Sequence, residues 1–221
     1  MVRFAWRDGA KIEDCDGGFE YLPDFVSHDE EQFLINKQLA HRRLQYWGGQ
    51  VAEKTNVLVS EPLPKFILEY PALIQRIAAT GAFANSKHSQ PNHCLVNEYK
   101  PGQGIMPHND GSAYFPAVAT LSLGSAILLD VFEYQDEATP TMPAFSILQE
   151  PRSLLITHGS AYQQYLHGIA ARDIDTAEDL DRVINRDMLT NPELRTAVHL
   201  QRDRRLSMTF RDVERVAPRL F

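Results

Sequence analysis

The chain has 221 residues, of which 43% are hydrophobic and 23% are charged. These fractions are ordinary for a globular protein and exclude a mostly disordered chain, a collagen and a coiled coil. The 22 lysines and arginines are outnumbered by 29 aspartates and glutamates, and the resulting net charge of −7 argues against a protein that coats nucleic acid without sequence preference.

The composition also bears on the compartment. No apolar run approaches the roughly 18 residues of a membrane-spanning helix, and the charged N-terminus lacks the apolar stretch of a secretory signal. Two cysteines are too few for a disulfide framework. We therefore expect a protein of the cytoplasm or nucleus that acts as a monomer and away from membranes.

The first third of the chain has the pattern of helices. Ser27 and Glu30 have the spacing of a capping box, which marks a helix start. A second helix is expected over residues 71–79, with a proline in its first turn and Gly81 as its stop. Residues 1–90 are therefore predicted to form an N-terminal helical part.

From His93 onward, short apolar runs are separated by glycine, proline and aspartate. Strands are predicted at residues 94–99, 117–123, 126–134, 145–149, 153–157, 165–170 and 205–213. Many short strands at this spacing are typical of a sandwich or barrel. A helical insert is predicted at 172–203. We expect an α+β fold in which residues 1–221 form one domain, with a double-stranded β-helix (jelly roll) at 91–216 and the N-terminal helices packed on it.

The most informative motif is a histidine and an aspartate two residues apart, His108 and Asp110. On extended backbone both side chains point the same way, so one imidazole and one carboxylate can reach a single ion. His167 lies on a later predicted strand and can supply a third ligand. Two histidines and one carboxylate on one side of a metal are typical of non-haem Fe(II) sites that use O₂. The alternative is a surface turn at residues 109–111.

The last predicted strand has a polar face. Alternation places Arg205, Ser207, Thr209 and Arg211 on one side and apolar residues on the other. Such a face meets solvent or lines a polar cavity. In a cavity, the two arginines would bind the carboxylates of a small acid, because the guanidinium fork matches carboxylate geometry.

Taken together, these motifs resemble the AlkB family of Fe(II)- and 2-oxoglutarate-dependent dioxygenases. The resemblance rests on Asn-x-Tyr at residues 97–99, His-x-Asp at 108–110, the distant His167 and Arg-x5-Arg at 205–211. Within the family, the chain is most similar to the homologue-six subfamily, over about residues 21–216. The segments that carry this closer match are 44–49, 91–97, 101–110, 122–125, 150–155 and 166–170.

The resemblance implies that His108, Asp110 and His167 ligate Fe(II), with 2-oxoglutarate and O₂ as co-substrates. Arg205 would bind the distal carboxylate of 2-oxoglutarate. Ser207 stands where the bacterial enzyme has an asparagine, so it would make fewer hydrogen bonds there. The residues implied for the 2-oxoglutarate pocket are Asn97, Tyr99, Leu155, Thr157, Arg205, Ser207, Thr209 and Arg211.

The resemblance also implies a reaction and a substrate. The reaction is oxidative demethylation of N-methylated bases, which releases formaldehyde, succinate and CO₂. The N-terminal part would supply a nucleotide-recognition lid. The long insert at 172–203 would restrict access of duplexes, which favours single-stranded or flexible RNA or DNA. The residues expected to contact this substrate are Arg42, Arg43, Trp47 and Tyr114.

Two other functions remain open from the sequence. The same iron site would also suit hydroxylation or demethylation of a protein or a small molecule. Alternatively, the jelly roll would be a non-catalytic adaptor for nucleic acid or protein, with a structural metal such as zinc, which accepts the same ligands. The arginine pair Arg205 and Arg211 argues against the adaptor, because a structural metal site needs no pocket for a dicarboxylate.

Overall fold

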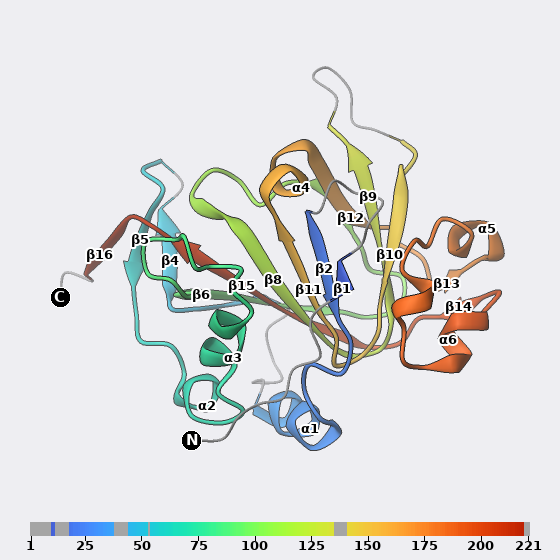
Figure 1. The fold of residues 1–221 in the computed structure, drawn as a ribbon, viewed down its shortest axis with the longest axis horizontal. Coiled ribbons are helices and arrows are strands. Elements are labelled where there is room, and N and C mark those ends of the chain that lie inside the picture. The colour runs from blue at the N-terminus through green and yellow to red at the C-terminus, as the bar shows by residue number, and fades with distance from the viewer. Residues whose placement is uncertain (1–9, 12–17, 38–43, 53, 135–140, 219–221) are drawn as a thin grey trace.

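The computed structural model describes residues 10–11, 18–37, 44–52, 54–134 and 141–218. Two antiparallel sheets lie at its centre (Figure 1). The larger sheet contains, in spatial order, β1 (Ala10–Lys11), β2 (Phe19–Leu22), β11 (Leu154–His158), β8 (Tyr114–Gly124), β15 (Arg205–Val213), β6 (His93–Tyr99) and β3 (Leu44–Trp47). The smaller sheet contains β10 (Phe145–Gln149), β9 (Ile127–Glu133), β12 (Tyr165–Ile169) and β7 (Ile105–His108). The predicted α+β fold with a jelly-roll core is confirmed.

The strands predicted from residue 94 onward are confirmed. They correspond to β6, β8, β9, β10, β11, β12 and β15. The predicted alternation along β15 is confirmed. Its apolar face joins a hydrophobic cluster through Leu206, Met208 and Phe210, and the polar residues between them face the other way. Both faces of this strand are buried, so its polar residues line a cavity and do not meet solvent.

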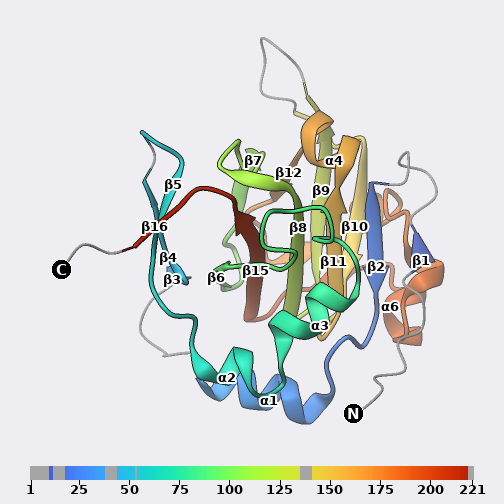
Figure 2. The same ribbon diagram turned by 60° about the vertical axis from the view of Figure 1, so that its left-hand side comes forward.

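Helices cover the outer face of the larger sheet (Figure 2). They are α1 (His28–Lys37), α2 (Lys65–Leu68) and α3 (Leu73–Ala79). The predicted capping box opens α1: the Glu30 amide donates to Ser27 Oγ at 3.2 Å, and the Ser27 amide donates to Glu30 Oε2 at 2.8 Å. Leu34 and Ile77 share the hydrophobic cluster of Met208, so these helices are fixed to the sheet by apolar packing.

The prediction that residues 1–90 are helical is wrong in part, because this region also contributes strands. β2 pairs with β11, and β3 pairs with β6, so both extend the larger sheet. A separate three-stranded sheet contains β4 (Gly49–Ala52), β5 (Val57–Ser60) and β16 (Val216–Pro218). These strands have three or four residues, too few for an alternating pattern to be distinguished from loops.

The predicted insert at 172–203 packs beside the smaller sheet, at the right of Figure 1. It contains β13 (Ile174–Asp175), α5 (Ala177–Leu180), the 3-10 helix η1 (Arg186–Met188), α6 (Pro192–Thr196) and β14 (Leu200–Gln201). Leu180 and Leu189 of the insert share a hydrophobic cluster with Ile147 of β10. Asn185 is fully buried and exchanges two hydrogen bonds of 2.9 Å with the backbone of Leu148. The insert is therefore docked on the sheet.

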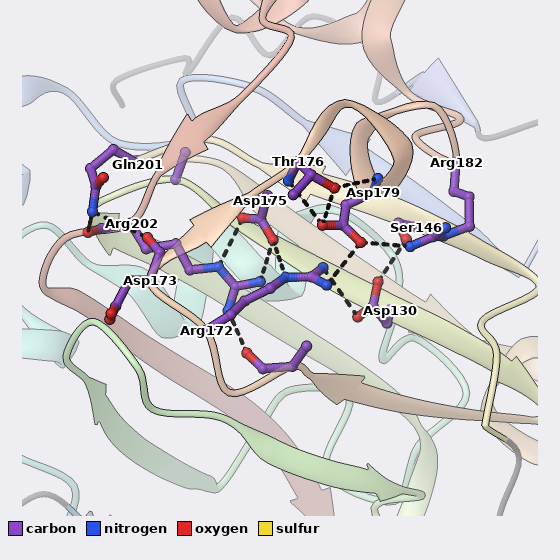
Figure 3. Close-up of polar contacts among 12 residues, drawn as sticks. Asp130, Ser146, Arg172, Asp173, Asp175, Thr176, Asp179, Arg182, Gln201 and Arg202 are labelled. Carbon is purple, nitrogen blue, oxygen red and sulfur yellow. Dashed lines mark hydrogen bonds and ion pairs between the residues drawn. The ribbon is translucent and has the colours of Figure 1, made fainter.

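An ion-pair network also holds the insert in place (Figure 3). Asp175 is fully buried and accepts hydrogen bonds from Arg202 Nε at 2.8 Å and from Arg172 Nε at 2.7 Å. Arg172 Nη1 also donates to Asp179 Oδ1 at 2.8 Å. Arg202 Nη1 donates to the carbonyl oxygen of Ala170 at 2.5 Å, so the network reaches the chain that follows β12.

Within the described residues, no helix is long and apolar enough to span a membrane.

Candidate metal centre and adjoining cavity

A cavity lies between the two sheets, and side chains from both line it. Eleven residues were predicted from the sequence to bind the metal or the co-substrate, and the structure brings all of them to this cavity. They are Asn97, Tyr99, His108, Asp110, Leu155, Thr157, His167, Arg205, Ser207, Thr209 and Arg211. Register explains part of this convergence, because Arg205 and Ser207 of β15 lie directly opposite Tyr99 and Asn97 of β6.

Arg205 is almost completely buried at one end of this cavity, with 2% of its surface exposed. Its Nε donates to Ser122 Oγ and its Nη2 donates to Gln149 Oε1, both at 2.9 Å. Its guanidinium carbon also lies 5.6 Å from the centre of the Tyr99 ring. Burial lowers the pKa of Arg205 to about 10, so the group stays charged near neutral pH. Among the described residues its contacts are with neutral groups.

A buried guanidinium without a carboxylate partner is costly unless an anion binds it. The arrangement around Arg205 therefore fits the distal carboxylate of 2-oxoglutarate. Ser122 and Gln149, the two residues that orient this arginine, were not predicted from the sequence. Both lie on strands that were predicted correctly. Gln149 is a large amide, 1% exposed, that follows the apolar Ile147 and Leu148 at the end of β10, and that pattern is the signal by which it could have been found.

The three predicted metal ligands face one another at the other end of the cavity. His108 and His167 are direct partners in the pairing of β7 with β12, and their ring centres are 4.5 Å apart. His167 Nε2 lies 4.0 Å from Asp110 Oδ2. His108 Nδ1 lies 2.8 Å from the carbonyl oxygen of Met106, so Nδ1–H donates and Nε2 remains available as a ligand.

Electrostatics favour the metal-binding forms of His167 and Asp110. Burial, opposed by the charge of Asp110, lowers the pKa of His167 to about 4, so its imidazole is neutral. Desolvation raises the pKa of Asp110, but the charge of Arg211 and its hydrogen bond to the carboxylate oppose this, and that pKa lies below its usual value. A neutral imidazole and an ionised carboxylate are the forms in which these two groups bind a metal.

The donor set fits Fe(II), although the side chains are not closed around an ion. Among the described residues, no three His, Cys, Asp or Glu side chains stand at ligating distances as placed. Bonds of about 2.1 Å put neighbouring ligand atoms about 3 Å apart, and the separation of His167 from Asp110 exceeds this by about 1 Å. Asp110 Oδ1 accepts a hydrogen bond from Arg211 Nη2.

The predicted substrate residues have different positions. Tyr114 lines a second cleft at the cavity mouth and lies beneath the guanidinium of Arg211, 4.8 Å away. Trp47 does not reach that cleft, because it packs edge-on against Phe66 at 5.2 Å beside the hydrophobic core. Its neighbour on β3, Tyr46, lines the cleft instead. The predictions for Arg42 and Arg43 fall outside the described residues.

Comparison with known proteins identifies the family. Residues 27–211 match the 2OG-Fe(II) oxygenase superfamily. The chain belongs to this superfamily. It is 39% identical, over 89% of its length and 86% of the relative's, to a zebrafish (Danio rerio) protein named probable RNA/DNA demethylase ALKBH6. It is thus an AlkB-type oxygenase. It is also 27% identical to the mouse (Mus musculus) protein named tRNA (carboxymethyluridine(34)-5-O)-methyltransferase ALKBH8, but it spans only 32% of that protein.

Solved structures support the same fold for this oxygenase. The structure of OsALKBH1 matches with a TM-score of 0.52 and 16% identity, over 88% of this chain and 96% of that one. A Pseudomonas putida prolyl-4-hydroxylase matches with a TM-score of 0.50 and 14% identity, over 97% of each chain. The superfamily uses Fe(II), 2-oxoglutarate and O₂, which is the chemistry that the cavity fits.

Proposed function

We propose that this oxygenase removes methyl groups from N-methylated bases in single-stranded or flexible RNA or DNA. The reaction consumes O₂ and 2-oxoglutarate and yields the demethylated base, formaldehyde, succinate and CO₂. The observation that carries the proposal is the buried Arg205, which has neutral partners among the described residues and lies in the same cavity as the three candidate iron ligands. The name of the zebrafish relative supports the substrate class.

The co-substrate would bind along the inner faces of β15 and β6. Arg205 would bind its distal carboxylate, held in place by Ser122 and Gln149. Asn97 and Tyr99 would donate hydrogen bonds to it from the neighbouring strand. Further contacts and the walls of this pocket would come from Leu155, Thr157, Ser207 and Thr209.

His108, Asp110 and His167 would hold Fe(II) at the mouth end. When bound, the ion would supply the activation of O₂ that oxidises a C–H bond of the methyl group. Met106 fixes the His108 ring through its carbonyl oxygen, so Nε2 is presented to the ion. Arg211 would orient the Asp110 carboxylate, with which it already forms an ion pair. These contacts would fix the reacting groups before substrate arrives.

The test measures succinate formation by the Fe(II)-loaded protein with 2-oxoglutarate and a panel of N-methylated single-stranded RNA and DNA oligonucleotides. We expect succinate to form in proportion to the number of methyl groups lost, which mass spectrometry measures. The Asp110→Ala variant and unmethylated oligonucleotides are the controls. Succinate without any change in the oligonucleotides would overturn the substrate class and direct the search to proteins or small molecules. No succinate, with oligonucleotide binding intact, would favour an adaptor.

A further inference from the structure

A second cleft adjoins the mouth of the cavity and shares Asp110 with it. One wall is formed by β3 and the β4–β5 hairpin, and the other by residues 110–114, which follow the candidate metal ligands. The Asn56 amide donates to Ser112 Oγ at 3.3 Å and links the two walls. A substrate in this cleft would therefore lie directly beside the candidate iron ligands.

His93 lines this cleft. It is the first residue of β6, and alternation places it on the same face as Leu95, Asn97 and Tyr99, which line the main cavity. Its direct partner on β15 is Arg211, the arginine that pairs with Asp110. The inward-facing residues of β6 therefore extend from Tyr99, at the co-substrate end of the main cavity, to His93 at the cleft.

The imidazole of His93 has no partner that explains its burial. The residue is 1% exposed, and neither ring nitrogen has a hydrogen-bond partner among the described residues. Burial, reinforced by the charge of Arg211, lowers its pKa to about 4. The ring is therefore neutral at physiological pH, with one N–H donor and one nitrogen acceptor. Buried polar groups in native proteins are nearly always paired, so such a group in a cleft is suited to pairing with a ligand.

Two aromatic rings flank this histidine. The ring centres of Tyr46 and Tyr114 each lie 6.1 Å from that of His93, with interplanar angles of 38° and 33°. Tyr46 is 47% exposed, so its ring is open to a partner from solvent. Aromatic faces bind planar heterocycles by stacking, and hydrogen bonds to the edge of the heterocycle add selectivity.

We propose that His93 determines substrate specificity, by forming a hydrogen bond with the edge of a nitrogen heterocycle that stacks on Tyr46 and Tyr114. This inference rests on the proposed demethylation of nucleobases and names the residue that reads the base. His93 acts on binding and orientation of the substrate. It takes no part in holding the co-substrate.

The test compares wild type with His93→Phe, which keeps a ring but removes both nitrogens, and His93→Gln, which restores a donor and an acceptor. His199→Phe is the matched control, because His199 is exposed on the insert. For each protein we would measure kcat and KM for the N-methylated oligonucleotide, the KM for 2-oxoglutarate, succinate formation without oligonucleotide, and the midpoint of thermal unfolding.

We expect His93→Phe to lower kcat/KM for the oligonucleotide roughly ten- to a hundredfold, mainly through KM, because one buried hydrogen bond is lost. His93→Gln should recover part of this loss. The KM for 2-oxoglutarate and the succinate formed without oligonucleotide should not change. The unfolding midpoint should be kept or raised, because an unpaired buried polar group is removed.

Three outcomes would overturn the inference, and they can be told apart. Unchanged oligonucleotide kinetics in His93→Phe would refute the role of His93 and leave the demethylase standing. Equal losses with and without oligonucleotide would assign His93 to the metal and co-substrate cavity. Wild type that neither binds nor demethylates any oligonucleotide would refute the proposed function and this inference with it. If His93→Phe does not fold, His93→Leu, which also lacks both ring nitrogens, provides the same comparison with His93→Gln.

Discussion

Arg202 and Arg205 lie three residues apart and are both almost completely buried, yet their surroundings differ. Arg202 donates two hydrogen bonds to the carboxylate of Asp175 and belongs to the network that docks the insert (Figure 3). Arg205 points into the cavity and contacts Ser122, Gln149 and the Tyr99 ring. A buried charge with its counter-charge beside it is structural, whereas one with neutral partners is suited to bind an anion. Burial alone would not distinguish the two residues.

The first prediction extends this comparison to the cavity mouth, where Arg211 pairs with Asp110. Asp110→Ala removes a candidate iron ligand and leaves Arg211 as a second unpaired arginine. We expect 2-oxoglutarate turnover to fall at least about a hundredfold, while the far-ultraviolet circular dichroism stays native. Asp187→Ala, on the exposed surface of the insert, serves as the control. Normal succinate formation by the Asp110 variant would refute the metal assignment.

The second prediction concerns the paired arginine. Arg202→Met leaves Asp175 without its bidentate partner, and breaking a buried pair in this way typically costs about 3 to 5 kcal/mol of unfolding free energy. Urea unfolding measures this loss. Arg204→Met is the matched control, because the exposed pair of Arg204 with Glu98 should contribute at most about 1 kcal/mol. Equal stability of the two variants would contradict a structural role for the network.

The third prediction concerns Arg205, which has no carboxylate partner among the described residues. Its replacement should weaken co-substrate binding without lowering stability. Arg205→Met removes the charge that would bind the distal carboxylate of 2-oxoglutarate, so its KM should rise roughly a hundredfold, as expected for a charge-assisted bidentate contact. The unfolding free energy should not fall, because no carboxylate loses its partner. Steady-state succinate kinetics and urea unfolding give the two values. A loss of stability as large as that of Arg202→Met would make Arg205 structural.

The smallest effect is expected at the residues that orient Arg205. Gln149→Leu removes the acceptor of one 2.9 Å hydrogen bond and keeps the charge. We expect the KM for 2-oxoglutarate to rise about three- to tenfold, with kcat nearly unchanged. Ser122→Ala tests the second acceptor in the same assay. An unchanged KM in both variants would show that Arg205 is held by the backbone of β15 alone.

Much of the cavity could be predicted from short-range patterns. Alternation along β15 predicted that Arg205 and Arg211 share one face, and the spacing of His108 and Asp110 predicted that the two would point the same way. The seven strands that were predicted after residue 93 were evident because each has enough apolar residues between turn residues. The iron and co-substrate roles of these residues remain predictions that the assays above test.

Other features depend on contacts between distant segments. Trp47 was predicted to contact the substrate, but the pairing of β3 with β6 turns Trp47 towards Phe66 and leaves Tyr46 at the cleft. β7 was missed because it has four residues and includes Pro107. A proline argues against a strand except at the edge of a sheet, and β7 is the edge strand of the smaller sheet. The different surroundings of Arg202 and Arg205 follow from tertiary partners that sequence spacing does not reveal.

The most direct test of the central claim compares two ligands by calorimetry on the Mn(II)-loaded protein. The ligands are 2-oxoglutarate and 2-oxopentanoate, which has a methyl group in place of the distal carboxylate. Wild type should bind 2-oxoglutarate much more tightly, and Arg205→Met should bind both acids equally weakly. Arg202→Met, if folded, should keep the wild-type preference. A preference for 2-oxoglutarate that survives in Arg205→Met would show that Arg205 does not bind the distal carboxylate, and would contradict the account of this cavity.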